Sequence, residues 1–445
     1  MLTRNFKIRY GIGDLSLSMP QAIIAFYQLF FLVDIAGLSP DRAGLAVIIG
    51  RLWDSVNDPL FGLLSDRIRS RFGRRRVLLL FGAIPMGLAF CLQFIVPPLG
   101  EWNNVIYYAA AIIFFDTIYT AVHVSYNALT PAITSDYDEQ SSLNGFRMSF
   151  SIVGSLLAVI AATVLGFYIE NQRILFMTLG IGLGVAATLP ILSAYSVSGP
   201  YDETGSDEEP MPAMEAIRAT LSNRPFWMVM GLYLFSWTTA SLLSSVLIFF
   251  ANYYLNIPDQ ANYLILVAQV SAIAFIPFWV WMAQRFDKRR AFIWGCISWI
   301  VVLAALASIG RDQVVLAYIL AALSGAGIAT AFFLPWAMIP DVIELDELKT
   351  GRRREGSFYA FAAFFQKLGT GLVIWLFGMA LASRGYITPV DGQPLPVQPP
   401  EAIQAIRWSA GLVPAILLVA AIIFAWYYPI TREYHEEIRS QGDEG

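Results

Sequence analysis

The chain has 445 residues, of which 57% are apolar and 14% are charged, and its formal net charge is −4. Soluble domains carry about 25% charged residues, so this composition excludes a water-soluble enzyme and predicts an integral membrane protein surrounded by a lipid bilayer. The small net charge also excludes a nucleic-acid partner, because phosphate binding needs clustered positive charge. Cys91 and Cys296 each stand alone within apolar stretches, which indicates neither a disulfide framework nor a metal site.

Apolar runs of about 20 residues, each long enough to cross the hydrocarbon core of a bilayer, recur along the whole chain. Their continuous apolarity indicates helices, since the strands of a membrane barrel alternate. The amino terminus lacks the order of a cleavable signal peptide, so the first run is expected to remain as a helix. The sequence therefore predicts an all-α membrane protein with twelve transmembrane helices. We expect them at 10–36, 43–63, 77–98, 104–131, 145–169, 174–195, 226–254, 260–284, 291–309, 314–338, 357–383 and 407–429.

Most of the 29 Lys and Arg residues lie in alternate connections between these runs, including Ser65–Arg76, Gln284–Arg290 and Lys349–Arg354. By the positive-inside rule, these connections face the cytoplasm. An even number of spans then places both termini on the same side. We expect a multi-pass protein of the plasma (inner) membrane with both termini in the cytoplasm.

A polar stretch from Tyr195 to Pro225 divides the predicted helices six and six. A weak repeat supports this division, because PLFGLLSDRIRSRFGRRR after the second run is similar to PFWVWMAQRFDKRR after the eighth. TPAITSDYDEQ and MIPDVIELDE form a second pair. We predict an N-terminal six-helix lobe at 1–195, a cytoplasmic linker at 196–225, a C-terminal lobe at 226–430 and a cytoplasmic tail at 431–445. Two such halves are what an alternating-access transporter requires.

Charged residues inside the second run give the clearest functional signal, since a charge in the bilayer persists only with a partner or a watery cavity. The segment GRLWDSVNDPLFG places Arg51, Asp54, Asn57 and Asp58 on one helix face. Asp54 and Asp58 are one turn apart, so a small cation between them could take oxygens from both and from Asn57. A salt bridge of Arg51 with either aspartate is the alternative, but it would leave the second carboxylate uncompensated.

A polar stripe follows one face of the fourth run and consists of Asp116, Tyr119, Thr120 and His123. His123 could bind a substrate, carry a proton near neutral pH, or be a neutral histidine satisfied by a neighbouring helix.

Arg147 and Lys367 also lie inside or at the edge of apolar runs, so each needs an anion. Asp54, Asp58, Asp116 or a substrate are the available choices. This predicts one shared central cavity.

Five motifs occur together and cover essentially the whole chain, and these are YGIGD, RLWDSVNDPLFG, YTAVHVSYNALTPAIT, NGFRMSF and REGSFYAFAAFFQKLG. In this combination the chain resembles the glycoside-pentoside-hexuronide:cation symporters of the major facilitator superfamily, typified by the bacterial melibiose permease. The resemblance implies a sodium, lithium or proton site formed by Asp54, Asn57, Asp58 and Thr120. It also implies that Lys367 lies beside this site; we expect Lys367 and Arg51 to act in coupling.

The expected substrate residues depart from the melibiose pattern. Melibiose permeases have a Lys-Asp pair where this chain has Leu17-Ser18, an Asp at the position of His123 and a Trp at the position of Asn127. Keeping Arg147 and gaining His123 shifts the pocket toward positive charge, which favours an anionic sugar such as a uronide or a sulfonated sugar. The predicted substrate residues are Ser18, Tyr119, His123, Asn127 and Arg147.

A lipid-like substrate is the alternative. The segments HVSYNALT and PWAMIPDVIELDELK are similar to the animal sodium-dependent lysophosphatidylcholine symporter, which belongs to the same superfamily branch. The partner is in either case a small molecule, a sugar or an amphiphile.

The predicted mechanism is symport by alternating access, coupled to Na⁺ or H⁺, in a monomer without a cofactor. Four residues are expected at a cytoplasmic gate, namely Asp66, Arg67, Arg74 and Asp287. An enzyme is disfavoured because the chain has only two histidines and no assembled nucleophile and base. A non-transporting receptor is disfavoured because it has little reason to keep both Asp54 and Asp58 in the membrane.

Overall fold

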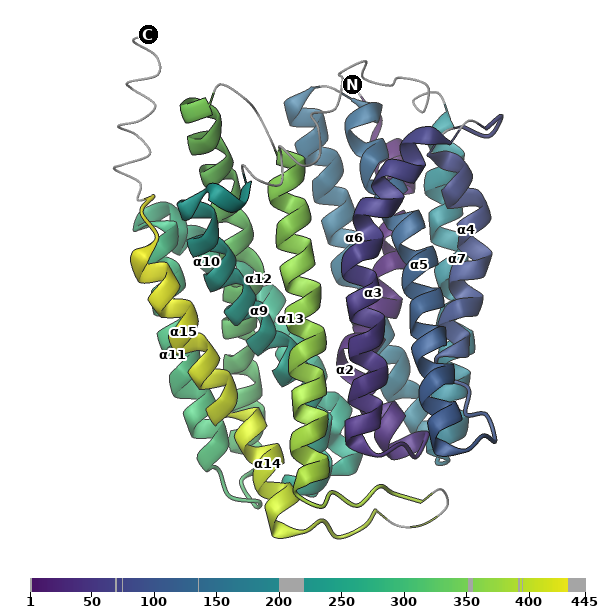
Figure 1. The fold of residues 1–445 in the computed structure, drawn as a ribbon, viewed down its shortest axis with the longest axis vertical. Helices are drawn as coiled ribbons and strands as arrows, with labels where there is room; N and C mark the ends of the chain where they lie inside the picture. Colours follow the sequence, from purple (N-terminus) through teal and green to yellow (C-terminus); the bar gives the residue numbers. More distant parts are fainter. Residues whose placement is uncertain are drawn as a thin grey trace. The chain divides into compact units, whose positions relative to one another are not determined.

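The computed structural model describes residues 2–68, 70–73, 75–134, 136–199, 220–350, 355–390, 393 and 395–430. Every regular element in this part of the chain is a helix (Figure 1), which confirms the all-α prediction. The elements are α1 (Arg4–Gly11), α2 (Gly13–Phe30), η1 (Phe31–Ile35), α3 (Pro40–Arg67), α4 (Arg76–Leu92), α5 (Glu101–Ile133), α6 (Tyr137–Tyr168), α7 (Gln172–Val197), α9 (Arg224–Phe249), η3 (Phe250–Tyr254), η4 (Pro258–Gln260), α10 (Ala261–Arg285), α11 (Lys288–Ser308), α12 (Val314–Thr350), α13 (Glu355–Ser383), α14 (Pro400–Ala410) and α15 (Leu412–Tyr427).

Ten helical segments in the described residues are long and apolar enough to cross a bilayer. The other two predicted spans correspond to α4, which is apolar but shorter, and α3, which carries the charged residues of the second run. Four spans extend six residues or more beyond their predicted ends. The first span begins at Arg4, α6 begins at Tyr137, α12 continues to Thr350 and the last span begins at Pro400. Apolarity marks only the bilayer-crossing part of a helix, whereas polar turns extend it beyond the lipid.

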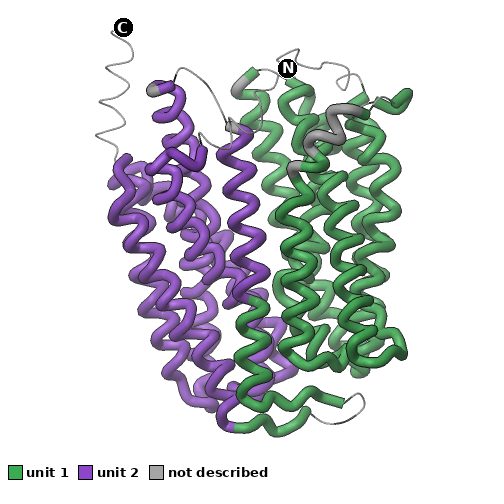
Figure 2. The backbone as a smooth tube through the Cα atoms, viewed as in Figure 1, with its two compact units in different colours: residues 1–207, 374–399 green, residues 208–373, 400–445 purple. Residues whose placement is uncertain are grey.

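The chain divides into two compact units (Figure 2). The first comprises residues 1–207 and 374–399, and the second comprises residues 208–373 and 400–445. The sequence placed 374–399 in the C-terminal lobe. Close packing explains the difference, because a Cβ on Gly378 of α13 would collide with the backbone carbonyl of Pro40, and one on Gly44 would collide with the backbone of Trp375.

The same scheme of helix pairing recurs inside each unit. In the first unit, the helix pairs α3–α5, α4–α7, α4–α5 and α2–α7 pack together. In the second unit, the corresponding pairs α10–α12, α11–α15, α11–α12 and α9–α15 pack together. Each set joins the second span to the fourth, the third to the sixth and to the fourth, and the first to the sixth. The repeat seen in the loop sequences therefore extends to the packing of the helices.

The first long helix of each unit ends in a π-helical turn of five residues, η1 after α2 and η3 after α9. Both turns finish alike. Ala36 N–H donates to the Phe31 carbonyl and Leu38 N–H to the Leu32 carbonyl, while Leu255 and Ile257 repeat these two bonds in the second unit. Gly37 (φ 77°) and Asn256 (φ 56°) each supply the left-handed residue that reverses the chain.

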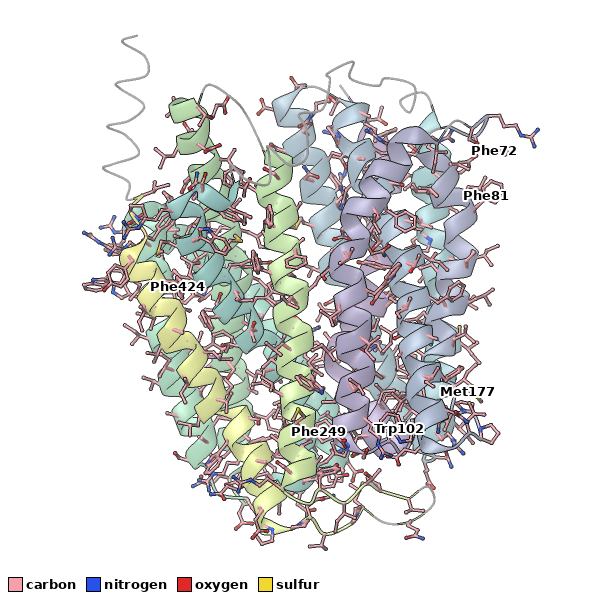
Figure 3. All side chains as sticks on the ribbon, viewed as in Figure 1. Phe72, Phe81, Trp102, Met177, Phe249 and Phe424 are labelled. Atoms are coloured by element: carbon pink, nitrogen blue, oxygen red, sulfur yellow. The ribbon has the colours of Figure 1, made fainter. Side chains whose placement is uncertain are left out.

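Large apolar side chains cover the outer surfaces of the helices, as lipid contact requires (Figure 3). Phe81 on α4, for example, is 58% exposed and lies at the edge of its unit in the figure. Inside the first unit, Phe31, Phe94 and Phe176 form a buried aromatic core with ring centroids 5.1 to 6.2 Å apart.

Candidate functional site

Two polar clusters lie inside the first unit, on helices that pack against each other. We call them the carboxylate cluster (Asp54, Asn57 and Asp58 of α3; Asp116 and Thr120 of α5) and the arginine cluster (Asp14 of α2; Tyr126, Asn127 and Thr130 of α5; Arg147 of α6). Helix α3 packs along α5, and α2 packs along α6. The helical repeat then turns the chosen residues of each helix to a common side.

The carboxylate cluster brings together the four residues expected to bind a cation. Thr120 Oγ1 lies 3.3 Å from Asp54 Oδ1 and 3.1 Å from Asp58 Oδ1. Asp54 and Thr120 are 4% and 1% exposed. A hydroxyl has one proton, so Thr120 donates to one carboxylate at a time and turns a lone pair toward its surroundings.

Asn57 contributes a neutral oxygen to the same cluster. Its side-chain nitrogen donates to the Asp116 backbone carbonyl at 3.1 Å. Its side-chain oxygen is buried without a hydrogen-bond partner. A buried polar atom normally has a partner, and an unpartnered oxygen about one turn from Asp54 and adjacent in sequence to Asp58 is suited to a hard cation.

Arg51 provides the salt bridge that the sequence offered as the alternative. Arg51 Nη1 lies 3.6 Å from Asp54 Oδ2, at i to i+3 on α3. Arg51 pairs with Asp54, whereas Asp58 accepts a hydrogen bond from Thr120. The salt bridge and a cation site can therefore coexist. Within the described residues, no group of three His, Cys, Asp or Glu side chains is arranged to hold a metal ion. The oxygen donors of this cluster are two carboxylates, an amide and a hydroxyl.

The arginine cluster centres on a buried ion pair that the sequence did not predict. Arg147 Nε lies 2.8 Å from Asp14 Oδ2. Its Nη1 donates to Thr130 Oγ1 at 2.8 Å, and its Nη2 donates to Asn127 Oδ1 at 2.5 Å. The guanidinium also lies over the Tyr126 ring, 4.2 Å from the centroid.

The predicted list of anions for Arg147 was therefore wrong, because it omitted Asp14. The signal was present. Asp14 is a carboxylate inside the first apolar run, within the motif YGIGD that supported the family resemblance. A charged residue inside a membrane helix is a candidate functional residue, because placing its charge in the bilayer costs free energy.

His123 and Tyr119 continue the arginine cluster along α5. Arg147 can only donate, so Asn127 must turn its oxygen toward Arg147 and its nitrogen toward His123 Nε2, 2.9 Å away. Nε2 then accepts, which makes His123 a neutral imidazole. The His123 ring stacks on Tyr119 with centroids 5.5 Å apart.

Tyr119 also links the two clusters, because it directly precedes Thr120 on α5 and its ring stacks on His123. Ser18 lies outside both clusters. Its hydroxyl donates to the Asp14 carbonyl of the preceding turn and fills the space beside Gly154. Among the predicted substrate residues, Tyr119, His123, Asn127 and Arg147 come together, and Ser18 does not join their hydrogen bonds.

The remaining predicted residues lie elsewhere. Lys367 is on α13 in the second unit, so its proximity to Asp54 or Asp58 stays a prediction. Asp66 and Arg67 end α3 but their side chains lie outside the described residues, as does Arg74.

Asp287 precedes α11. Burial raises the pKa of its carboxyl, opposed by the backbone N–H groups of Arg289 and Lys288 and by the nearby Arg290. The neighbouring Lys288 instead makes an ion pair that was not predicted, with its Nζ 2.7 and 2.8 Å from the two Asp341 carboxylate oxygens. Asp341 belongs to MIPDVIELDE, one of the repeated loop motifs.

Comparison with known proteins identifies the family. Residues 9–432 match the family model described as MFS/sugar transport protein. The chain is 34% identical to a protein of Synechocystis named an uncharacterized symporter, over 98% of this chain and 96% of the relative. It is 26% identical to the sodium-dependent lysophosphatidylcholine symporter 1 of Xenopus tropicalis, over 97% and 88%.

Solved structures show the same fold. The crystal structure of a D-xylose-proton symporter superposes with a TM-score of 0.69 at 14% sequence identity, covering 95% of this chain and 96% of the other. The chain belongs to the MFS/sugar transport protein family, which consists of multi-pass membrane transporters and not of enzymes.

Proposed function

We propose that this member of the MFS/sugar transport protein family is a cation-coupled symporter that carries a sugar or glycoside by alternating access. Family membership supports transport, and the 34% identical relative is named a symporter. The observation that carries the coupling is the carboxylate cluster, where Thr120 hydrogen-bonds to Asp54 and Asp58. The same helix turn carries Asn57, whose buried side-chain oxygen has no hydrogen-bond partner.

The cation is cargo in this scheme. It would take oxygens from Asp54, Asp58, Asn57 and Thr120, and it would reduce the repulsion between two neighbouring carboxylates. A proton could do the same by neutralising one of them. Both Na⁺ and H⁺ therefore fit the cluster, and transport measurements with each ion decide between them.

Substrate binding is assigned to the arginine cluster with His123 and Tyr119. Asn127 is exposed, and it offers amide groups that hydrogen-bond well to sugar hydroxyls. Tyr119 stacks on His123 and directly precedes Thr120 on α5, so a movement of α5 on binding at one site would reach the other. Coupling between the sites must be reciprocal. Lys367 and Arg51 would contribute to this coupling.

A lysophospholipid-type substrate is the second candidate. It is favoured by the similarity to the Xenopus lysophosphatidylcholine symporter, which extends over nearly the full length of both chains. An amphiphile would need the polar clusters for its headgroup and an apolar slot for its chain. We place the protein in the plasma (inner) membrane as a monomer, with both termini in the cytoplasm.

Reconstituted protein tests the proposal. Uptake into proteoliposomes is measured with inward gradients of Na⁺, Li⁺ or H⁺, using neutral glycosides, uronides, sulfonated sugars and lysolipids as substrates. We expect uphill uptake of a glycoside with one of these ions and none with choline. Asn57→Leu should weaken the apparent affinity for the coupling ion about tenfold. This is the effect of losing one interaction of about 1.4 kcal/mol, the size of a hydrogen bond.

Asn104→Leu is the matched control, because Asn104 is also buried on a membrane helix and also has an unpartnered side-chain oxygen. It should transport normally. Equal loss in both variants would mean that general destabilisation explains the effect. Uptake driven equally well by choline would defeat the cation assignment.

A further inference from the structure

The charge of the arginine cluster differs from what an anion site needs. Asp14 and Arg147 are both partly buried, with side chains only 13% and 12% exposed, and their charges cancel at 2.8 Å. His123 is neutral, because its Nε2 accepts from Asn127. The two cationic donors that would attract an anionic substrate therefore reduce to one neutralised guanidinium and one neutral imidazole.

The carboxylate cluster makes the surroundings more negative. The two clusters together with Arg51 contain four carboxylates, Asp14, Asp54, Asp58 and Asp116, and two guanidiniums. One bound Na⁺ leaves a net charge of −1. Counting Lys367 as the predicted neighbour brings the total to zero. These groups therefore carry no net positive charge that would attract an anion into a low-dielectric site. Arg75 is a further cation nearby, and its Nη1 donates to the Ala128 carbonyl, outside the hydrogen bonds of the arginine cluster.

We propose that Asp14 is a specificity-determining residue, which cancels the charge of Arg147 so that the site accepts substrates without net negative charge. The inference rests on the proposed function in that the arginine cluster is taken as the substrate site. It names the substrate class as a neutral polyol or a zwitterion. Removing the Asp14 charge would release one positive charge where substrate binds, and anionic analogues would then bind better.

Asp14 is held firmly in the position that this role requires. Tyr126 OH lies 3.3 Å from the same Asp14 Oδ2 that receives Arg147, and it also donates to the Tyr10 carbonyl at 2.6 Å. The preceding residue, Gly13, lets α2 approach closely, because a Cβ there would lie 3.0 Å from the Tyr126 ring. An incoming carboxylate would have to displace an anion that two helices fix in place.

The exposed and partly exposed groups of the substrate site suit hydroxyls. Asn127 is exposed, and His123 is partly exposed beside it. In their neutral forms, each of these two side chains can donate and accept hydrogen bonds. A polyol hydroxyl also donates and accepts, so it can join this chain of hydrogen bonds without bringing a charge.

The test uses pairs of probes that differ in charge. Purified protein is titrated with 4-nitrophenyl glucoside and glucuronide, 4-nitrophenyl galactoside and galacturonide, and lysophosphatidylcholine and lysophosphatidylglycerol, with and without NaCl, by calorimetry. In wild type, the uncharged or zwitterionic member of a pair should bind at least tenfold more tightly. Asp14→Asn should move this ratio at least tenfold toward the anion.

Two further variants separate charge from folding. Asp34→Asn removes a buried carboxylate in the same span that pairs with Tyr386 rather than with Arg147, and it should leave the ratio unchanged. Asp14→Asn combined with Arg147→Gln removes both charges and should restore a ratio close to wild type. If Asp14→Asn does not fold, the wild-type ratio still decides the question, because a preference for the anionic members overturns the assignment.

A wild-type preference for the anionic members, or an unchanged ratio in Asp14→Asn, overturns the assignment of Asp14. Binding that does not depend on any cation contradicts the proposed coupling. The ratio of affinities for the uncharged and anionic probes still tests the role of Asp14. Binding of only the lipid pair defeats the sugar assignment, and the lipid ratio then decides. Absence of binding by every probe overturns both proposals.

Discussion

Thr120 Oγ1 of α5 lies 3.1 Å from Asp58 Oδ1 of α3, inside the first unit. The contact joins helices whose sequence positions are far apart, so it depends on how α3 packs along α5. A cation bound here would hold the two helices together. Its loss would change the packing of the helix that also carries His123 and Asn127.

Asp58→Asn should abolish uphill substrate accumulation while expression and folding stay near normal. The substitution removes an anionic ligand without changing side-chain volume. Ion-driven uptake and size-exclusion profiles measure the two effects. Asp41→Asn is the control, since Asp41 is an acidic residue in the first turn of the same helix, outside the cluster. Wild-type substrate accumulation by the Asp58→Asn variant would contradict the assignment of Asp58 as a cation ligand.

Thr120→Val should weaken Na⁺ binding about tenfold, and Thr120→Ser should keep it, because only serine retains the hydroxyl. Na⁺-dependent thermal stabilisation gives the affinities. Thr163→Val on α6 is the control, because Thr163 is buried and donates only within its own helix to Val159. If serine and valine behave alike at Thr120, the hydroxyl is not a ligand.

Lys367→Ala should weaken the sodium dependence of transport at acidic pH. If Lys367 lies near Asp54 or Asp58 as predicted, its removal leaves more negative charge at the cation site, and protons then compete better with sodium. Uptake at pH 5.5 to 8 in the presence of sodium checks this. Transport indistinguishable from wild type across that range would make Lys367 peripheral to coupling.

Tyr386→Phe should lower stability by about 1 to 3 kcal/mol, the scale for a buried hydrogen bond to a charged group. Tyr386 OH donates to Asp34 Oδ1 at 2.7 Å, and Asp34 is 7% exposed. Thermal unfolding of both single variants and of Tyr386→Phe with Asp34→Asn completes a double-mutant cycle. Additive effects in this cycle would show that the two residues do not interact energetically.

Asp287→Asn tests a stability that depends on pH. Burial raises the pKa of Asp287 above its ordinary value of 3.8, so the folded protein favours the protonated acid. The resulting stabilisation is complete below pH 3.8 and is lost as pH rises through the folded pKa. The melting temperature of wild type minus that of Asp287→Asn should therefore fall as the pH rises from 3.8 through the raised pKa of Asp287. A constant difference would contradict this.

The carboxylate cluster was predictable because its geometry is mostly local. Asp54, Asn57 and Asp58 share one helix, so their common face follows from the 3.6-residue repeat. Thr120 was predicted from the polar face of a second helix and from the family resemblance. The transmembrane helices themselves were predictable because crossing a bilayer requires long apolar runs.

The Asp14–Arg147 pair was not predictable by this reasoning. Its partners are 133 residues apart, and only the packing of α2 against α6 brings them together. Several acidic residues were possible ion-pair partners for Arg147. The periodicity within one helix does not show which of them lies close to it. An anionic substrate was inferred from Arg147 and His123 alone, and the role that we propose for Asp14 would reverse this expected selectivity.

The π-helical turns of η1 and η3 have a consequence for the history of the chain. Such a turn holds an additional residue and is rare in helices, and here it occurs at the same place in both units with the same closing hydrogen bonds. The simplest account is that an ancestral six-helix gene acquired this insertion once and was then duplicated and fused. The insertion would then be older than the fusion, and the two halves would have kept it while their surrounding sequences diverged.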